Sequence, residues 1–143
     1  MFSLSPLLPP FFLTHFFPNH QYNVVINSLA KSGGKDAAKE AEKLLGKMHK
    51  LYEEGDLHVK PNVVTYGAVI DAYAKSGEKY AAARADTLLA KMIHLNQMDP
   101  VTNSDLQPNT YVFNTVINAH AKSKEVRGVY NVHGCHALSN VIS

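Results

Sequence analysis

The chain of 143 residues has no tryptophan and a single cysteine, Cys135. One cysteine excludes an internal disulfide framework and fits a reducing compartment. Charge is also nearly balanced, because the chain has 14 Lys and Arg and 12 Asp and Glu, which gives a net charge of +2. So small an excess neither requires nor excludes a nucleic-acid partner. Hydrophobic residues make up 45% of the chain, which is enough to build a packed core.

No long uninterrupted hydrophobic run is present. The most apolar stretch, residues 1–17, carries three prolines and is shorter than the ~20 residues of a bilayer-spanning helix. The first basic residue is Lys31, so this stretch lacks the basic start of a secretory signal and the arginines of a mitochondrial transit peptide. We expect residues 1–18 to be disordered or a vestigial targeting segment, and we expect no membrane partner.

Motifs of catalysis are missing too. The eight histidines are scattered, and no glycine-rich phosphate loop or Ser/His/Asp arrangement can be argued. His133, Cys135 and His136 lie close together, but no second ligand pair has the spacing of a zinc site. The sequence therefore predicts no enzyme, no metal, no cofactor and no small-molecule substrate.

What the chain does contain is a repeat. Residues 22–51 align with residues 66–95 at an offset of 44, and 16 of these 30 positions are identical. At an offset of 47, residues 113–123 match residues 66–76 at six identical positions. Self-similarity of this kind is typical of stacked helical arrays.

Each unit has the pattern of two helices. In the second unit Tyr66, Val69, Ile70 and Tyr73 recur with the period of an amphipathic helix, and Gly77 suits a helix end. A second apolar stripe follows in each unit, at Ala37, Ala41, Leu44, Leu45 and Met48, and at Ala81, Ala85, Leu88, Leu89 and Met92. Each inter-unit loop ends in Pro-Asn, where proline stops a helix and asparagine caps the next. We predict an all-α solenoid of helical hairpins.

These features resemble the pentatricopeptide repeat family. The resemblance rests on VVTYGAVIDAYAKSGE at residues 63–78, on Ala-x-x-x-Ala-x-x-Leu-Leu-x-x-Met at residues 81–92, and on the closing Pro-Asn. A tetratricopeptide repeat, whose arrays are similar in shape, would show a Trp-x-x-Leu-Gly-type start and a period of ~34 residues, and neither is found. The resemblance implies binding of single-stranded RNA with one base per repeat.

The repeat divides the chain into five expected segments. They are the apolar segment 1–18, a first unit at 19–62, a second unit at 63–109, the first helix of a third unit at 110–124, and a non-repeat tail at 125–143. The units are longer than the family's usual repeat, with the extra residues after the methionine of the second helix. The tail carries no alanine-rich stripe, so we expect it to be irregular, as after intron read-through or in a truncated gene model.

The resemblance also assigns positions that would read bases. The slot after the first aromatic residue of each unit holds Asn23, Gly67 and Asn114, and the second slot, just before the next unit, holds Asn62 and Asn109. The slot that sandwiches a base holds His20, Val64 and Tyr111. The resemblance implies pyrimidine reading by Asn23 with Asn62 and weak selectivity at Gly67. We expect Asn23 and Asn114 to be exposed along one inner trough, and Gly67 to face away from Ile70.

Three groups among the polar residues have a structural role as an open alternative. Asn23 and Asn114 could simply be polar residues of the helix face. Asn62 and Asn109 are equally good helix caps. Lys31, Lys75 and Lys122 recur at the end of each first helix, where they would either contact phosphates or complement the helix dipole.

Three functions remain. One is an RNA-binding solenoid for organellar RNA processing or stabilisation, in mitochondrion or plastid as the family implies, with other RNA-processing proteins as further partners. The second is a protein-binding solenoid, and the third is a truncated product without stable function, because such arrays generally need ~3 repeats.

Overall fold

The computed structural model describes residues 19–123, which form five α-helices and no strand. The helices are α2 (Asn19–Ser32), α3 (Lys35–Glu53), α4 (Val63–Ser76), α5 (Ala81–Met98) and α6 (Thr110–Lys122). Two short 3-10 helices, η1 (Leu57–Val59) and η2 (Ser104–Leu106), lie between the units. The predicted all-α hairpin array is confirmed. The expectations for residues 1–18 and for the tail at 125–143 lie outside the described residues.

Local capping explains where α4 and α6 begin and where α4 ends. The Asn62 Oδ1 accepts hydrogen bonds from the backbone N–H groups of Val64 and Thr65, at 3.0 and 3.1 Å, and the Thr65 hydroxyl accepts one from the Asn62 N–H. This reciprocal pair is a capping box. Asn109 caps α6 through the N–H of Val112 at 3.0 Å. Gly77 ends α4 with a φ of 67°, a conformation that glycine adopts without strain. Both predicted asparagine caps are confirmed.

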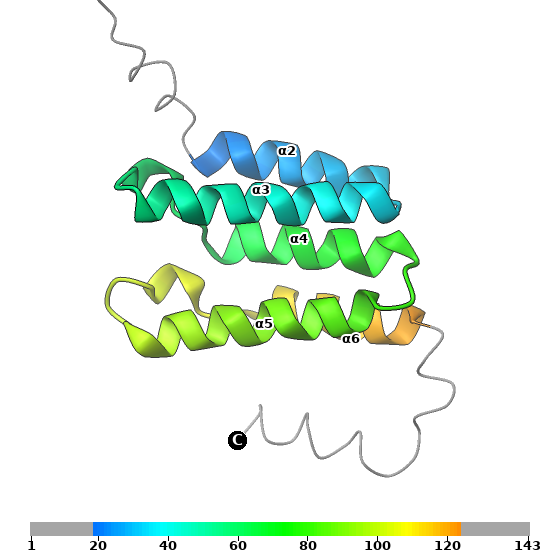
Figure 1. The fold of residues 1–143 in the computed structure, drawn as a ribbon. Helices are drawn as coiled ribbons and strands as arrows, with labels where there is room; N and C mark the ends of the chain where they lie inside the picture. The colour runs from blue at the N-terminus through cyan, green and yellow to red at the C-terminus, as the bar shows by residue number, and fades with distance from the viewer. Residues whose placement is uncertain (1–18, 124–143) are drawn as a thin grey trace, which may run out of the picture.

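The helices form two layers, as Figure 1 shows. The first helices of the units, α2, α4 and α6, lie side by side in one layer, and α3 and α5 cover the same side of it. The central helix, α4, contacts the other four. Its Tyr66, Val69 and Ile70 are completely buried, so the core is centred on this helix. In residues 19–123 no helix is both long and apolar enough to cross a membrane.

The extra length of the units goes into packed loops. Val59 in η1 and Leu106 in η2 are 1% and 2% exposed, so each loop contributes to the apolar interior. Lys60 ties the two loops together, because its Nζ donates to the Thr102 carbonyl and lies 2.8 Å from the Asp105 carboxylate. The additional residues therefore stabilise the edge of the array where the N-termini of the first helices lie.

Neighbouring units meet through two stripes on each first helix. The leading stripe, which on α4 and α6 faces the preceding unit, consists of Gln21, Val24, Val25, Ser28 and Ser32 on α2, Thr65, Ala68, Val69, Ala72 and Ser76 on α4, and Val112, Thr115, Val116 and Ala119 on α6, with the C-cap Ser123. The trailing stripe, which on α2 and α4 faces the following unit, consists of Asn23, Ile26 and Ala30 on α2, Gly67, Ile70 and Ala74 on α4, and Asn114, Ile117 and Ala121 on α6.

The contacts between stripes are direct. The Thr65 hydroxyl of a leading stripe donates to the Asn23 Oδ1 of a trailing stripe at 2.7 Å. At the next junction, a Cβ placed on Gly67 would lie 3.5 Å from Val112. At both junctions of the array, the trailing stripe of one unit therefore packs on the leading stripe of the next unit.

Candidate nucleic-acid interface

A third stripe on each first helix stays open to solvent on the side away from α3 and α5. On α4, which is otherwise enclosed, this inner stripe consists of Val64, Asp71 and Lys75. The equivalent residues are His20, Asn27 and Lys31 on α2, and Tyr111, Asn118 and Lys122 on α6. The first and third of each set are exposed and the middle one is partly exposed. Because the helices lie side by side, the three stripes form one surface with three rows, which we call the inner face.

The first row holds the residues of the predicted base-sandwiching slot. Val64 is 52% exposed and Tyr111 is 54% exposed, although both are apolar enough to favour burial. Tyr111 also leans toward the preceding unit, because a Cβ on Gly67 would come within 2.9 Å of its ring. Exposed apolar and aromatic side chains in this arrangement offer flat surfaces on which bases can stack.

The expected exposure of Asn23 is wrong. Asn23 is 8% exposed, its amide Nδ2 donates to Asn19 Oδ1 at 2.8 Å, and its Oδ1 accepts from Thr65. Its position belongs to the trailing stripe, so the next unit covers it. Gly67 is buried for the same reason, and it lies on the same side of α4 as Ile70, contrary to the expected separation of their faces. Asn114 is exposed, as expected.

The second-slot residues act in capping. The oxygen of Asn62 is engaged by two backbone N–H groups and by the Thr65 hydroxyl, and the oxygen of Asn109 by one N–H. Within the described residues no hydrogen bond is found for either amide nitrogen. The assignment of Asn23, Asn62, Val64, Gly67, Asn109, Tyr111 and Asn114 as RNA-binding residues stays a prediction.

The lysine row carries the positive charge of the inner face. Lys75 pairs with Asp71 at 2.5 Å, whereas no carboxylate of residues 19–123 forms an ion pair with Lys31 or Lys122. The middle row, with Asn27, Asp71 and Asn118, was missed by sequence reasoning. Its signal was present in the spacing, since each member stands seven residues after the sandwiching slot and four before the lysine, which places all three on one helix face.

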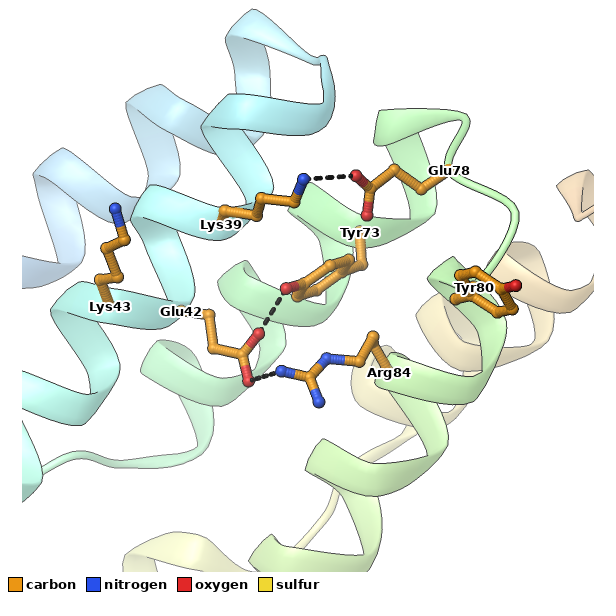
Figure 2. Close-up of a pocket in the computed structure, with 7 residues that line it drawn as sticks. All are labelled: Lys39, Glu42, Lys43, Tyr73, Glu78, Tyr80 and Arg84. Carbon is orange, nitrogen blue, oxygen red and sulfur yellow. Dashed lines mark hydrogen bonds and ion pairs between the residues drawn. The ribbon is translucent and has the colours of Figure 1, made fainter.

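The opposite side of the array contains a cleft of about 460 Å³ between α3 and α5. Figure 2 shows Tyr73 of α4 at its floor, with Glu42 and Arg84 meeting across it. The Tyr73 hydroxyl donates to Glu42, and Arg84 donates to the same carboxylate at 2.7 Å. Burial, and secondarily the bond to Glu42, raises the pKa of Tyr73 to about 12.

This outer network recurs at the next junction. Asp86 stands 44 residues after Glu42, His120 stands 47 residues after Tyr73, and the two groups are 2.8 Å apart. A carboxylate on each second helix thus holds the first helix of the following unit. Because the charges of the cleft are largely paired with one another, we regard the cleft as a structural junction.

Among the residues that the structure describes, no cluster of three or more His, Cys, Asp or Glu could hold a metal ion. In a comparison with protein families, residues 64–82 and 111–135 match the PPR repeat. The second match reaches beyond Lys124, where the repeat pattern was expected to end. No curated protein and no solved structure matches the chain.

The two matched segments begin at Val64 and Tyr111, which are 47 residues apart and equivalent in the hairpin array. The helices and the family matches therefore give the same register, and the chain carries PPR repeats in these two segments.

Proposed function

We propose that the chain binds single-stranded RNA along the inner face and acts in organellar RNA processing or stabilisation without catalysing a reaction. The observation that carries this proposal is the alignment of the three rows. Exposed stacking surfaces, partly exposed amides or a carboxylate, and lysines succeed one another in the same order on three neighbouring helices. A strand crossing the helices would meet a base-stacking position and a cation at every unit.

The units would differ in what they read. Among the described residues Asn23 donates only one of its two amide hydrogens, to Asn19, and its oxygen accepts from Thr65. Because the side chain is buried, an RNA base would have to compete with these internal contacts to reach it. At Gly67 the ring of Tyr111 occupies the space of a reading side chain, which supports the expected weak selectivity of the second unit. Asn114 is exposed, and among residues 19–123 its side-chain amide forms no hydrogen bond, so both polar atoms can bind a base. The pyrimidine preference at Asn23 with Asn62 is part of the proposal.

A few base contacts cannot define one transcript, so other RNA-processing proteins are expected to add specificity. Residence in mitochondria or plastids follows from the family alone and is part of the same proposal. A fluorescent fusion of the full chain would test it, and exclusive staining outside both organelles would contradict it.

The lysine row allows a direct test of RNA binding. Binding of a labelled pyrimidine-rich RNA should weaken with salt, because each neutralised phosphate releases counterions. Lys31→Ala with Lys122→Ala should lower the logarithmic salt slope by about 1.4, which corresponds to two phosphate contacts of a single strand.

The matched control removes two equivalent lysines of the outer layer, Lys47 and Lys91, and therefore changes the net charge by the same amount. We expect the control to leave the slope near its original value. Equal slopes for both double variants, or affinity independent of salt, would contradict binding along the inner face and would favour a peptide ligand.

A further inference from the structure

The leading stripe of α2 is exposed, although the same stripe is buried on the other two first helices. Val24 and Val25 are both 50% exposed, and Gln21, Ser28 and Ser32 are exposed as well. The equivalent valine of α4, Val69, is 0% exposed, and that of α6, Val116, is 3% exposed. All remaining members of the stripe on α4 and α6 are buried. The α2 stripe therefore has the form of a unit junction whose other half is missing from the described residues.

The complementary half lies at the other end of the described array. On the trailing stripe of α6, Ile117 is 54% exposed, whereas the equivalent Ile26 and Ile70 are both 0% exposed. Asn114 and Ala121 are exposed too. In sequence this stripe reads Asn-Ile-Ala, identical to the trailing stripe of α2, which already packs on a leading stripe.

We propose that the two open stripes bind each other between two copies of this chain, so that α6 of one copy packs head-to-tail on α2 of the next. The internal junctions of the molecule are the template for this interface. At the first of them Thr65 donates to Asn23. In the intermolecular junction the amide of Gln21, which is equivalent to Thr65, would donate to Asn114, which is equivalent to Asn23. Val24 and Val25 would cover Ile117, because their equivalents Ala68 and Val69 belong to the same buried cluster as Ile26, the equivalent of Ile117.

The interface is heterologous, since each copy contributes a different surface, and each added copy exposes a new open stripe. Such contacts give chains or rings rather than a closed pair. If the proposed RNA binding holds, the junction would also place His20 of the next copy beside Tyr111 and Asn114, and would continue the inner face from copy to copy. The association itself does not depend on that function.

Two blocking variants test the proposal, one at each end. Val25→Glu places a charge in the leading stripe, and Ile117→Glu places one in the trailing stripe. Both positions are about half exposed, so each variant should keep the helical circular dichroism of the parent chain. The parent chain should show a mean mass by sedimentation velocity that rises with concentration above the 15.8 kDa of one copy. Each variant alone should stay at the mass of one copy.

The mixture of the two variants is the decisive sample. Val25→Glu keeps an intact trailing stripe and Ile117→Glu keeps an intact leading stripe, so one junction can form and the mass should double and stop there. A symmetric dimer would behave differently, because one variant alone would remain dimeric and the mixture would form no hetero-pair. Val101→Glu, at an 88% exposed loop position, is the control and should associate like the parent chain.

A parent chain that is monomeric at every concentration, or a mixture that stays at the mass of one copy, would overturn the proposal. Loss of RNA binding in a normally associating chain would instead overturn only the proposed function.

Discussion

Helices α2 and α4 have related sequences and equal lengths of 14 residues, but they differ in what surrounds them. In α4 ten residues are buried, and in α2 only three. The identical pair Val25 and Val69 shows the difference most clearly, at 50% and 0% exposure. The shared repeat pattern is thus that of a helix with a packed helix on each side. The exposure of each residue depends on whether those neighbouring helices are present.

The largest expected effect of this difference comes from a charge placed in the leading stripe. Val69→Asp would bury an unpaired carboxylate at the centre of the core and should destabilise the fold by about 4 kcal/mol or more. Val25→Asp introduces the same charge at the equivalent position of α2, where water solvates it, and should change stability by about 0.5 kcal/mol or less. Urea denaturation at low protein concentration, followed by circular dichroism, measures both. Equal losses would mean that α2 is as enclosed as α4.

A smaller effect is expected at His49, whose ring lies against the buried tyrosine of α4. Tyr66 of α4 is fully buried and lies 2.8 Å from the His49 ring nitrogen, whereas its equivalent Tyr22 is only partly buried. Burial, aided by Lys91, lowers the pKa of His49 from 6.5 to about 4. Above pH 6.5 the His49 ring is neutral in both the folded and the unfolded chain. The free energy of unfolding is then not reduced by proton uptake at this residue.

Between pH 6.5 and 4 the unfolded chain takes up the proton and the folded chain resists it, so stability falls as the pH falls. Because the ring is partly solvated, we expect a loss of about 1 to 2 kcal/mol across this interval. His49→Gln should remove that part of the pH dependence while leaving the stability at pH 7 within about 1 kcal/mol of the parent. The comparison uses urea denaturation at pH 7 and pH 5. An unchanged pH dependence in the variant would show that His49 is not its source.

The smallest effect is expected at the asparagines of the trailing stripe. Asn23→Ala removes the buried acceptor of the Thr65 hydroxyl and should cost about 1 kcal/mol. Thr65 retains a contact with Asn62 at 3.1 Å, which limits the loss. Asn114→Ala is the equivalent change at an exposed position and should be close to neutral in a dilute, unassociated chain. Thermal denaturation of the two variants in parallel would sharpen the comparison, and a larger loss for Asn114 would reverse it.

Much of the fold follows from the sequence because its causes are local. The caps at Asn62 and Asn109 and the left-handed turn at Gly77 arise from contacts within a few residues, and the apolar stripes of the second helices follow the helical period. The repeat itself gives the order of the helices, since equivalent segments must make equivalent contacts. The carboxylates that hold the next unit, Glu42 and Asp86, follow the same offset but were not predicted, because their partners Tyr73 and His120 differ chemically.

The candidate site was predicted less completely. The sandwiching residues Val64 and Tyr111 are exposed on the inner face, but the reading residue Asn23 is covered by the next unit. Helical periodicity places Asn23 three residues before Ile26, and both belong to the face that a neighbouring helix buries. A pattern within one helix cannot show which of its faces the next unit will cover.

The sequence by itself determined that this chain folds as helical hairpins, where α4 and α6 begin and α4 ends, and that the hairpins are alike enough to stack. Only the tertiary structure decided which face of each first helix is shared between units, which is enclosed and which remains open. The physical reason is that capping and helical period act over a few residues, whereas burial depends on helices some 40 residues away in the chain, such as Asn23 and Thr65 with a separation of 42.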